Sequence, residues 1–274
     1  MNKDICCEIC PHECILSEGK TGVCTVRKNI GGKIVSDAYG KITALALDPI
    51  EKKPLHMFRP GSMILSVGSY GCNFRCPFCQ NNEIAMPQSA VSYKEITPVE
   101  ILQLAHETVA KGNIGVAYTY NEPLINFEFI YDCAKIVNAA GLNNIIVTNG
   151  FINPKPLEKL LPFIDAMNID LKCFTNKMYK KIGGELEVVK NTISAAHKSC
   201  HVEVTTLVIP GENENDIEQI AQWLASIDPE IPLHISRFFP NHKYADRAPT
   251  PRDTILNSME TAKKYLKNIF IGNM

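Results

Sequence analysis

Three cysteines stand close together in one short segment of the chain. They are Cys72, Cys76 and Cys79, spaced C-x3-C-x2-C, with Phe78 directly before the third. A cubane iron–sulfur cluster is usually held by four cysteines. Three thiolates can therefore hold a [4Fe–4S] cluster while one iron stays open to a ligand that is not protein, and chemistry can take place at that iron. A zinc knuckle is the structural alternative to this interpretation.

A second group of cysteines lies near the N-terminus. Its spacing, C-x2-C-x3-C-x9-C, supplies four thiolates at Cys7, Cys10, Cys14 and Cys24. Four thiolates suffice for a tetrahedral zinc site or for a second iron–sulfur cluster. A segment of about 30 residues cannot bury a useful core, so a bound metal would explain how it folds. The spacing does not choose between zinc and iron–sulfur, and Cys6 or His12 could replace one ligand.

The composition of the 274 residues sets the broad class of protein. The net charge of −1 gives no electrostatic reason to expect nucleic acid or an anionic membrane as partner. No apolar run reaches the roughly 18 residues of a membrane span, and the first residues lack the apolar core of a signal peptide. We therefore expect a cytoplasmic protein in which the eleven cysteines stay reduced and the clustered ones bind metal.

The order of elements after residue 60 predicts the fold. Short β-branched runs alternate with amphipathic helical stretches, which is typical of repeated βα units and a parallel sheet. We expect an α/β fold, an incomplete TIM barrel of about six βα units. The predicted domains are a cysteine-rich metal-binding module with a β-rich link at 1–40, its boundary extending to about 60, and the partial barrel at 60–274. The predicted strands lie near 63–67, 115–119, 144–148, 166–171, 201–208 and 233–238, with a short one near 269–271.

Polar side chains follow several of these predicted strands. In parallel barrels, reactive groups gather at the C-terminal strand ends, where the cysteine loop after residue 67 should also lie. Asp170 and Lys172 alternate onto one face and form either a structural ion pair or part of a site. The other candidates are Asn121 and Glu122 after the second strand, Thr148 and Asn149 at the third, and His234 in the sixth.

The cysteine motif resembles that of the radical SAM superfamily. In that superfamily the open iron chelates the amino and carboxylate groups of S-adenosylmethionine (SAM), and reductive cleavage gives a 5′-deoxyadenosyl radical. A Gly-Gly-Glu motif there contacts the SAM amino group; Tyr120, Asn121 and Glu122 stand at this motif, with only the acid retained. Asp170-Leu171-Lys172 resembles the glycyl-radical-enzyme activases, in which these positions help to hold SAM. The resemblance implies that the candidates above, with Phe78, bind the cofactors.

A longer set of motifs resembles one branch more closely. Asp48-Pro49-Ile50-Glu51-Lys52-Lys53-Pro54-Leu55, the cysteine motifs and the strand-end motifs are similar to AmmeMemoRadiSam-system radical SAM enzymes, often described as pyruvate formate-lyase activating enzyme-like. This implies an oxidoreductase that abstracts hydrogen from a protein or peptide and takes electrons from a donor such as flavodoxin or ferredoxin. Radical modification of a small molecule, or a non-catalytic SAM-binding iron–sulfur partner protein, are the alternatives.

Overall fold

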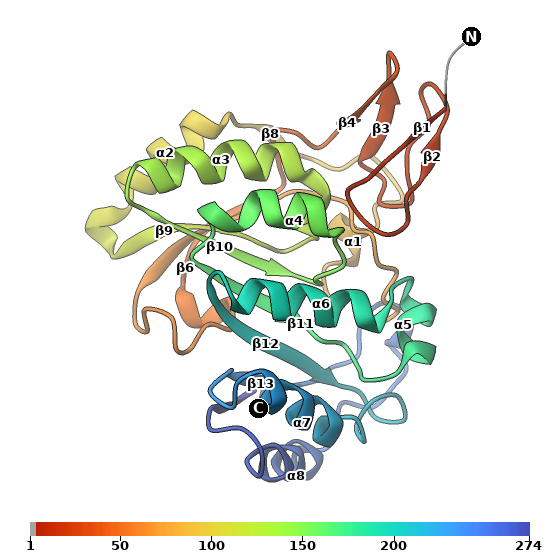
Figure 1. Cartoon of the computed structure of the whole chain (residues 1–274), viewed down its shortest axis with the longest axis vertical. Helices are drawn as coiled ribbons and strands as arrows, with labels where there is room; N and C mark the ends of the chain where they lie inside the picture. Colours follow the sequence, from red (N-terminus) through yellow and green to blue (C-terminus); the bar gives the residue numbers. More distant parts are fainter. Residues whose placement is uncertain (1–3) are drawn as a thin grey trace.

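The structure, a computed structural model, describes residues 4–274, so residues 1–3 of the predicted N-terminal module lie outside the described residues. Its centre is an eight-stranded sheet in the order β14-β13-β12-β11-β10-β9-β7-β6 (Figure 1). Neighbouring strands are parallel, except that β6 pairs antiparallel with β7. The strands are β6 (Ala44–Pro49), β7 (Met63–Gly68), β9 (Asn113–Tyr118), β10 (Asn143–Thr148), β11 (Ala166–Asp170), β12 (His201–Val208), β13 (Leu233–Arg237) and β14 (Ile269–Gly272).

The predicted α/β fold, an incomplete TIM barrel, is confirmed. Among the described strands none joins β6 to β14, so the barrel is left unclosed between these two edges. Each predicted strand is present, and the short one near 269–271 is β14. The edge strand β6 was expected to belong to the link. The alternation of apolar and polar residues in β6 is weak because the strand ends in Asp48 and Pro49 and because an edge strand buries only part of its surface.

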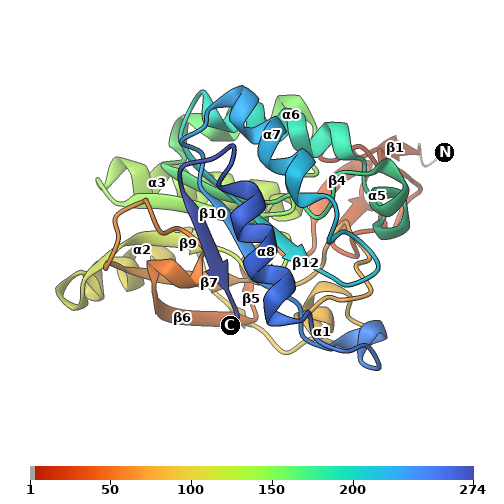
Figure 2. The same ribbon diagram turned by 90° about the horizontal axis from the view of Figure 1, so that it is seen from below.

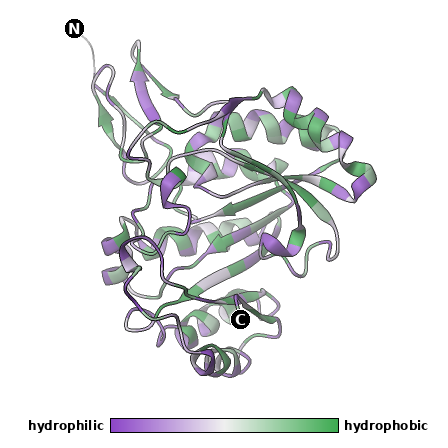
Figure 3. Ribbon diagram, turned by 180° about the vertical axis from the view of Figure 1, so that it is seen from behind, coloured by the Kyte–Doolittle hydropathy of each residue, from purple (hydrophilic) through white to green (hydrophobic). Residues whose placement is uncertain are grey.

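Helices cover the outer face of the sheet (Figures 1 and 2). In Figure 3 the strands of the central sheet are largely hydrophobic and the helices carry both colours, as expected for helices with one packed face. The α-helices are α1 (Asn82–Ala85), α2 (Pro98–Glu107), α3 (Phe127–Ala139), α4 (Pro154–Leu160), α5 (Asn176–Ile182), α6 (Leu186–His197), α7 (Ile217–Ile227) and α8 (Arg252–Ala262). The 3-10 helices are η1 (Ile50–Lys52), η2 (Val109–Lys111), η3 (Pro123–Asn126), η4 (Leu161–Phe163) and η5 (His242–Tyr244). Among the described residues, no helix is long and apolar enough to cross a membrane.

Local signals in the sequence define two of these helices. Thr97 forms a capping box at the start of α2: its side chain accepts from the Glu100 amide at 3.3 Å, and the Glu100 carboxylate accepts from the Thr97 amide at 2.7 Å. In α7 the apolar residues at helical spacing are buried against the sheet. These interactions fix where α2 begins and which face of α7 packs against the sheet.

The N-terminal residues form small hairpins beside the barrel. The strands are β1 (Ile5–Cys6), β2 (Ile15–Leu16), β3 (Arg27–Ile30) and β4 (Lys33–Ser36), and β5 (Lys41–Ile42) pairs with β8 (Lys94–Glu95). Buried Arg27 pairs with Glu128 of α3. His12 Nε2 lies 2.8 Å from the Asn73 carbonyl oxygen, and the Asn153 amide donates to the Ile9 carbonyl at 2.9 Å. The cysteine-rich segment is therefore attached directly to the loop that carries Cys72, Cys76 and Cys79.

The segment between β6 and β7, residues 50–62, closes the N-terminal end of the barrel, and we call it the floor loop. The carboxylate of Glu203 in β12 is fully buried and accepts from the amides of His56 at 3.0 Å and Met57 at 2.8 Å. It also accepts from His201 at 2.9 Å and His234 at 2.6 Å. Burial alone would raise the pKa of Glu203, but these four hydrogen bonds lower it to about 2. One carboxylate therefore fixes the floor loop to two strands.

Replacing Glu203 with alanine should destabilise the fold, because four donors at the floor would lose their acceptor. Breaking a buried, hydrogen-bonded charge typically costs about 3–5 kcal/mol, which corresponds to a fall of roughly 6–20 °C in the thermal unfolding midpoint of a chain of this size. The midpoint can be measured by differential scanning fluorimetry on anaerobically purified protein.

The exposed Glu187, which pairs with Lys190, provides the control: Glu187→Ala should leave the midpoint almost unchanged. The stabilisation by ionised Glu203 should be complete above its unfolded pKa of 4.5 and decline as the pH falls toward 2. Equal midpoints for the Glu203→Ala variant and the wild type would contradict the proposed role of this carboxylate.

Candidate active site

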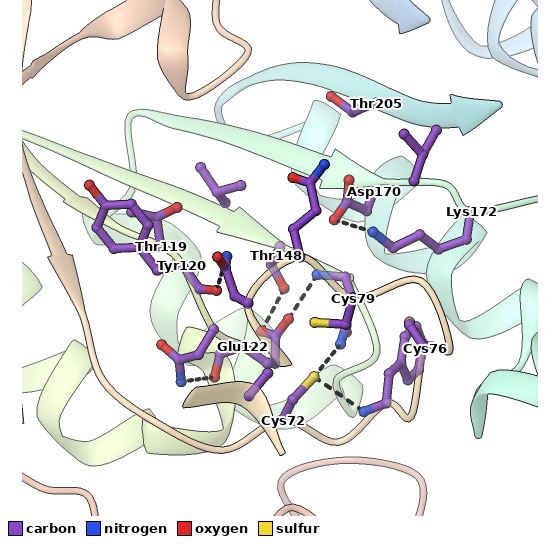
Figure 4. Close-up of a pocket in the computed structure, with 18 of the residues that line it drawn as sticks. Cys72, Cys76, Cys79, Thr119, Tyr120, Glu122, Thr148, Asp170, Lys172 and Thr205 are labelled. Carbon is purple, nitrogen blue, oxygen red and sulfur yellow. Dashed lines mark hydrogen bonds and ion pairs between the residues drawn. The ribbon is translucent and has the colours of Figure 1, made fainter. Parts of the chain in front are cut away.

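A cavity of about 420 Å³ opens where the parallel strands end (Figure 4). Its volume lies within the range of small-molecule and cofactor sites. The predicted site residues that line it are Cys72, Cys76, Cys79, Phe78, Asn121, Glu122, Thr148, Asn149, Asp170 and Lys172. The structure thus brings together side chains from the ends of β7, β9, β10 and β11.

The three cysteines lie on the loop after β7. Phe74 is 1% exposed and Phe78 is 4% exposed, so two aromatic rings anchor the loop to the core. The Phe74 amide donates to Cys72 Sγ at 3.3 Å, and Asn149 Nδ2 donates to the same sulfur at 3.7 Å. Such donors stabilise a thiolate that ligates an iron–sulfur cluster. The loop therefore fits the cluster that the cysteine spacing predicts.

Burial dominates the acidity of these thiols before metal binds. It raises the pKa of Cys72, and it raises the pKa of Cys76 to about 12. Metal ligation must therefore release protons from the thiols. Within residues 4–274 no three His, Cys, Asp or Glu side chains are close enough to hold a single metal ion. A [4Fe–4S] cluster needs its sulfurs farther apart than a single ion does, because the cluster itself separates them.

Glu122 lies beside this loop and is 2% exposed. Its carboxylate accepts from the Thr148 hydroxyl at 2.7 Å, from the Asn149 amide at 2.8 Å and from the Leu124 amide at 3.0 Å. Burial raises its pKa to about 7, although the three hydrogen bonds act in the opposite direction. A cationic partner such as an ammonium group would stabilise the charged form. The structure therefore places Thr148 and the Asn149 backbone as supports of Glu122.

Asn121 and Tyr120 replace the two glycines of the superfamily motif. Tyr120 adopts the left-handed backbone conformation that glycine would favour, with φ of 73°. Its hydroxyl donates to Asp48 at 2.8 Å, which helps to offset the strain of that conformation. Asn121 Nδ2 donates to the carbonyls of Tyr70 at 3.0 Å and Gly71 at 3.1 Å. Asn121 therefore holds the base of the cysteine loop.

The sequence left open whether Asp170 and Lys172 form an ion pair or belong to a site, and the structure shows both. Their side chains pair at 2.6 Å, and both line the cavity (Figure 4). Burial would lower the pKa of Lys172, but Asp170 and the nearby thiols of Cys76 and Cys79 raise it. The ammonium therefore stays charged next to the cysteine loop.

His234 does not line the cavity, so the structure does not bring it together with the other predicted site residues. It lies near the N-terminal end of β13, is 4% exposed, and contacts Glu203 and the rings of His56 and Phe270. Ser236, two residues further along the same face, lines the cavity instead. The alternation of side chains along β13 correctly placed His234 and Ser236 on one face of the strand. Only Ser236, which is closer to the C-terminal end of the strand, reaches the cavity.

Several residues of the cavity are not indicated by any sequence pattern. Lys52, Lys53 and Pro54 of the floor loop line it, as do Tyr120 and Thr205. The motif that begins at Asp48 contains both lysines, but its sequence alone does not indicate a cavity. Nothing local in the sequence shows that a loop from the opposite end of the barrel reaches the cavity.

The N-terminal cysteines are packed but do not form a ready-made metal site in the described residues. Cys7, Cys10 and Cys24 are buried and Cys14 is half-buried. Burial raises the pKa of Cys10 to about 11, and it also raises the pKa of Cys24. The second metal site stays a prediction, with zinc and iron–sulfur both open.

Comparison with known proteins defines the class. The sequence profile described as "Radical SAM superfamily" matches residues 66–224, which include the cysteine loop and the ends of β7 to β12. The chain belongs to the radical SAM superfamily. The predicted [4Fe–4S] cluster and SAM are the cofactors typical of this superfamily.

Three relatives show how far the likeness extends. "Uncharacterized protein MJ0808" of Methanocaldococcus jannaschii is 42% identical over 98% of this chain and 81% of its own length. MJ1227 of the same organism, provisionally named a glycyl-radical enzyme activating enzyme, is 28% identical over 74% of this chain and 85% of its own. A GTP 3′,8-cyclase of Lactiplantibacillus plantarum is 27% identical over 73% of this chain and 57% of its own.

A solved structure shows the same fold. A domain of the pyruvate-formate lyase-activating enzyme from Bacteroides vulgatus superposes with a TM-score of 0.50 at 21% sequence identity, over 58% of this chain and 99% of that domain. The likeness supports the partial barrel. The relation to activating enzymes is distant.

Replacing Cys72, Cys76 and Cys79 together with alanine should remove about four irons per chain, because this loop is predicted to hold one cubane cluster. Iron and sulfide can be measured chemically after anaerobic reconstitution. The half-buried and solitary Cys200 provides the control, and Cys200→Ala should keep its full iron content. Full iron content and continued SAM cleavage in the triple variant would contradict the cluster assignment.

The same triple variant tests the N-terminal site. Residual zinc would indicate a structural metal, whereas residual iron with sulfide would indicate a second cluster that feeds electrons to the first. Absence of any metal would contradict both versions of the second site.

Glu122→Gln should weaken SAM binding by at least about tenfold, because it removes a buried negative charge while preserving the size of the side chain. The visible spectrum of the cluster should stay unchanged. Affinity can be measured by anaerobic equilibrium dialysis with labelled SAM. The exposed Glu158 on α4 is the matched control. SAM affinity unchanged within twofold would exclude Glu122 from the SAM site.

Proposed function

We propose that this chain is an AmmeMemoRadiSam-type radical SAM enzyme that abstracts hydrogen from a protein or peptide, as an activase does. The observation that carries the proposal is a single cavity that joins three cysteines to Glu122 and to the Asp170–Lys172 pair. When bound, a reduced [4Fe–4S] cluster and SAM supply the 5′-deoxyadenosyl radical characteristic of radical SAM enzymes. The chain itself provides binding, orientation and protection from water.

The side chains divide this work among them. The Glu122 carboxylate is suited to accept a hydrogen bond from the SAM ammonium. The Thr148 hydroxyl donates to this carboxylate at 2.7 Å and fixes its orientation. Asn149 donates to Cys72, so it connects the Glu122 network to a cluster ligand. The apolar Phe74 and Leu207 also line the cavity and limit the water around a reactive radical.

A protein or peptide substrate is favoured by two observations. The barrel is left unclosed between β6 and β14 in the described residues, which would let an extended segment approach from the side. One relative is provisionally named a glycyl-radical enzyme activating enzyme, and its match covers 74% of this chain. An electron donor such as flavodoxin or ferredoxin belongs to the same proposal.

Radical modification of a small molecule is the second candidate. A match of similar identity is to a GTP 3′,8-cyclase, although this chain spans only 57% of that enzyme. The cavity also carries polar groups at Thr205 and Ser236 that would suit a small polar substrate. A non-catalytic SAM-binding partner protein would bind the same cofactors without cleaving SAM.

The test is an anaerobic assay of the reconstituted protein with SAM and a strong reductant, followed by mass spectrometry. Formation of 5′-deoxyadenosine is expected, with the Cys72/Cys76/Cys79 triple variant as the inactive control. Candidate substrates grown with deuterium then identify the donor. Deuterium in 5′-deoxyadenosine from labelled proteins supports the activase proposal, and deuterium only from small-molecule extracts supports the second candidate. An intact, reduced cluster without SAM cleavage would leave only the non-catalytic partner.

A further inference from the structure

The floor-loop end of the cavity contains an unusual group of charges around Asp48. The Asp48 carboxylate lies 2.9 Å from Lys53 Nζ and 3.3 Å from Lys52 Nζ, and it accepts from the Tyr120 hydroxyl at 2.8 Å. The side chain of Lys53 is 4% exposed and that of Asp48 is 12% exposed, whereas Lys52 is 67% exposed. We call Lys52, Lys53, Asp48 and Tyr120 the cationic corner.

The corner carries one more positive charge than negative charge. Hydrogen bonds from Lys53 and Tyr120 lower the pKa of Asp48 although burial opposes them, so the carboxylate is ionised. The side chain of Lys53 is 4% exposed, so its charge has lost much of its hydration, and this burial lowers its pKa. Two ammonium groups facing one carboxylate leave a net charge of about +1. A further anion would stabilise this arrangement.

The corner also has donors to spare. Each lysine ammonium has three N–H groups. Among the described contacts, each of these two lysines gives one to Asp48, and Lys53 also lies 4.7 Å from the centre of the Tyr120 ring. Both lysines line the cavity, so the remaining donors belong to side chains that reach it.

The other charged side chains of the cavity already have counterparts. Lys172 pairs with Asp170 at 2.6 Å. Glu122 is suited to the ammonium of SAM. Of the charged side chains that line the cavity in the described part of the chain, the two lysines of the cationic corner are thus the ones with excess positive charge.

The position of the corner separates it from the expected SAM carboxylate. Figure 4 shows Tyr120 on the side of the cavity away from Cys76 and Lys172. In the superfamily the amino and carboxylate groups of SAM bind at the cluster, which these cysteines are predicted to hold. An anion bound at the other side of the cavity would therefore come from another molecule.

We infer that the cationic corner binds an anionic group of the substrate, a carboxylate or a phosphate, through Lys52 and Lys53. This inference rests on the proposed function and narrows its substrate class. It applies to an acidic peptide segment and to an anionic small molecule alike. Lys52 at the exposed rim meets the anion first, and buried Lys53 orients it inside the cavity.

The test uses the reconstituted, SAM-saturated protein and isothermal titration calorimetry with three probes: inorganic phosphate, malonate, and a short peptide containing glutamate. At least one probe should bind, and Lys52→Gln should weaken that binding at least about fivefold. Lys52→Arg keeps the charge and should retain the affinity within about threefold. Lys263, an exposed lysine of similar kind paired with Glu260, provides the control variant Lys263→Gln.

The probes also distinguish the sources of the anion. Tighter binding of phosphate supports a phosphorylated substrate. Tighter binding of malonate supports a small carboxylate, and tighter binding of the peptide than of malonate supports an acidic protein segment. A probe that binds the reconstituted protein without SAM but not the SAM-saturated protein would assign the corner to the SAM carboxylate and overturn the inference. No binding of any probe, or equal binding to wild type and Lys52→Gln, would overturn it as well.

Failure of this inference can be told apart from failure of the proposed function. If the wild type forms 5′-deoxyadenosine but binds none of the probes, only the inference that the cationic corner binds an anionic group of the substrate would be overturned. Absence of SAM cleavage, with the cluster intact and reduced, would overturn the proposed function and with it the assignment of the anion to a substrate.

Discussion

The buried carboxylate of Glu122 is the interaction on which the site depends. It comes from the end of β9, accepts from the end of β10 through Thr148 and Asn149, and is connected through the Asn149 side chain to Cys72 after β7. A buried carboxylate without partners would be costly, so these three strand ends are held together by the need to satisfy it. Burial favours the neutral carboxyl and outweighs these hydrogen bonds, so the pKa of Glu122 is raised to about 7. The same group that organises the strand ends is thus well placed to gain from a bound cation.

A second buried carboxylate organises the opposite end of the barrel. Glu203 fixes the floor loop by accepting the amides of His56 and Met57. Asn168 Nδ2 adds a hydrogen bond to the Pro54 carbonyl at 2.8 Å. With Pro54, His56 and Met57 fixed in this way, the floor loop presents Lys52 and Lys53 to the cavity. The contacts that fix the floor loop therefore also set the position of two lysines that line the cavity.

The N-terminal hairpins support the cysteine loop from outside the barrel. Gly71, at the start of that loop, adopts φ of 83°, and a Cβ there would lie 2.6 Å from the Cys24 carbonyl oxygen. Only glycine allows this close approach. His12 contacts the backbone of Asn73 in the same loop. Any metal held by the N-terminal cysteines would therefore influence the geometry of the loop that carries Cys72, Cys76 and Cys79.

The sequence by itself determined the features that depend on local spacing. The C-x3-C-x2-C motif, the capping box at Thr97 and the order of strands and helices follow from interactions between residues a few positions apart. Such patterns also placed Glu122, Thr148 and Asp170 at strand ends, where the parallel barrel brings them together.

Only the tertiary structure decided which side chains reach the cavity. His234 and Ser236 share a face of β13, and depth along the barrel separates them. Lys52 and Lys53 reach the cavity because Glu203, about 150 positions away in the chain, holds the floor loop. Contacts between such distant residues depend on how the strands assemble, and no local pattern encodes them.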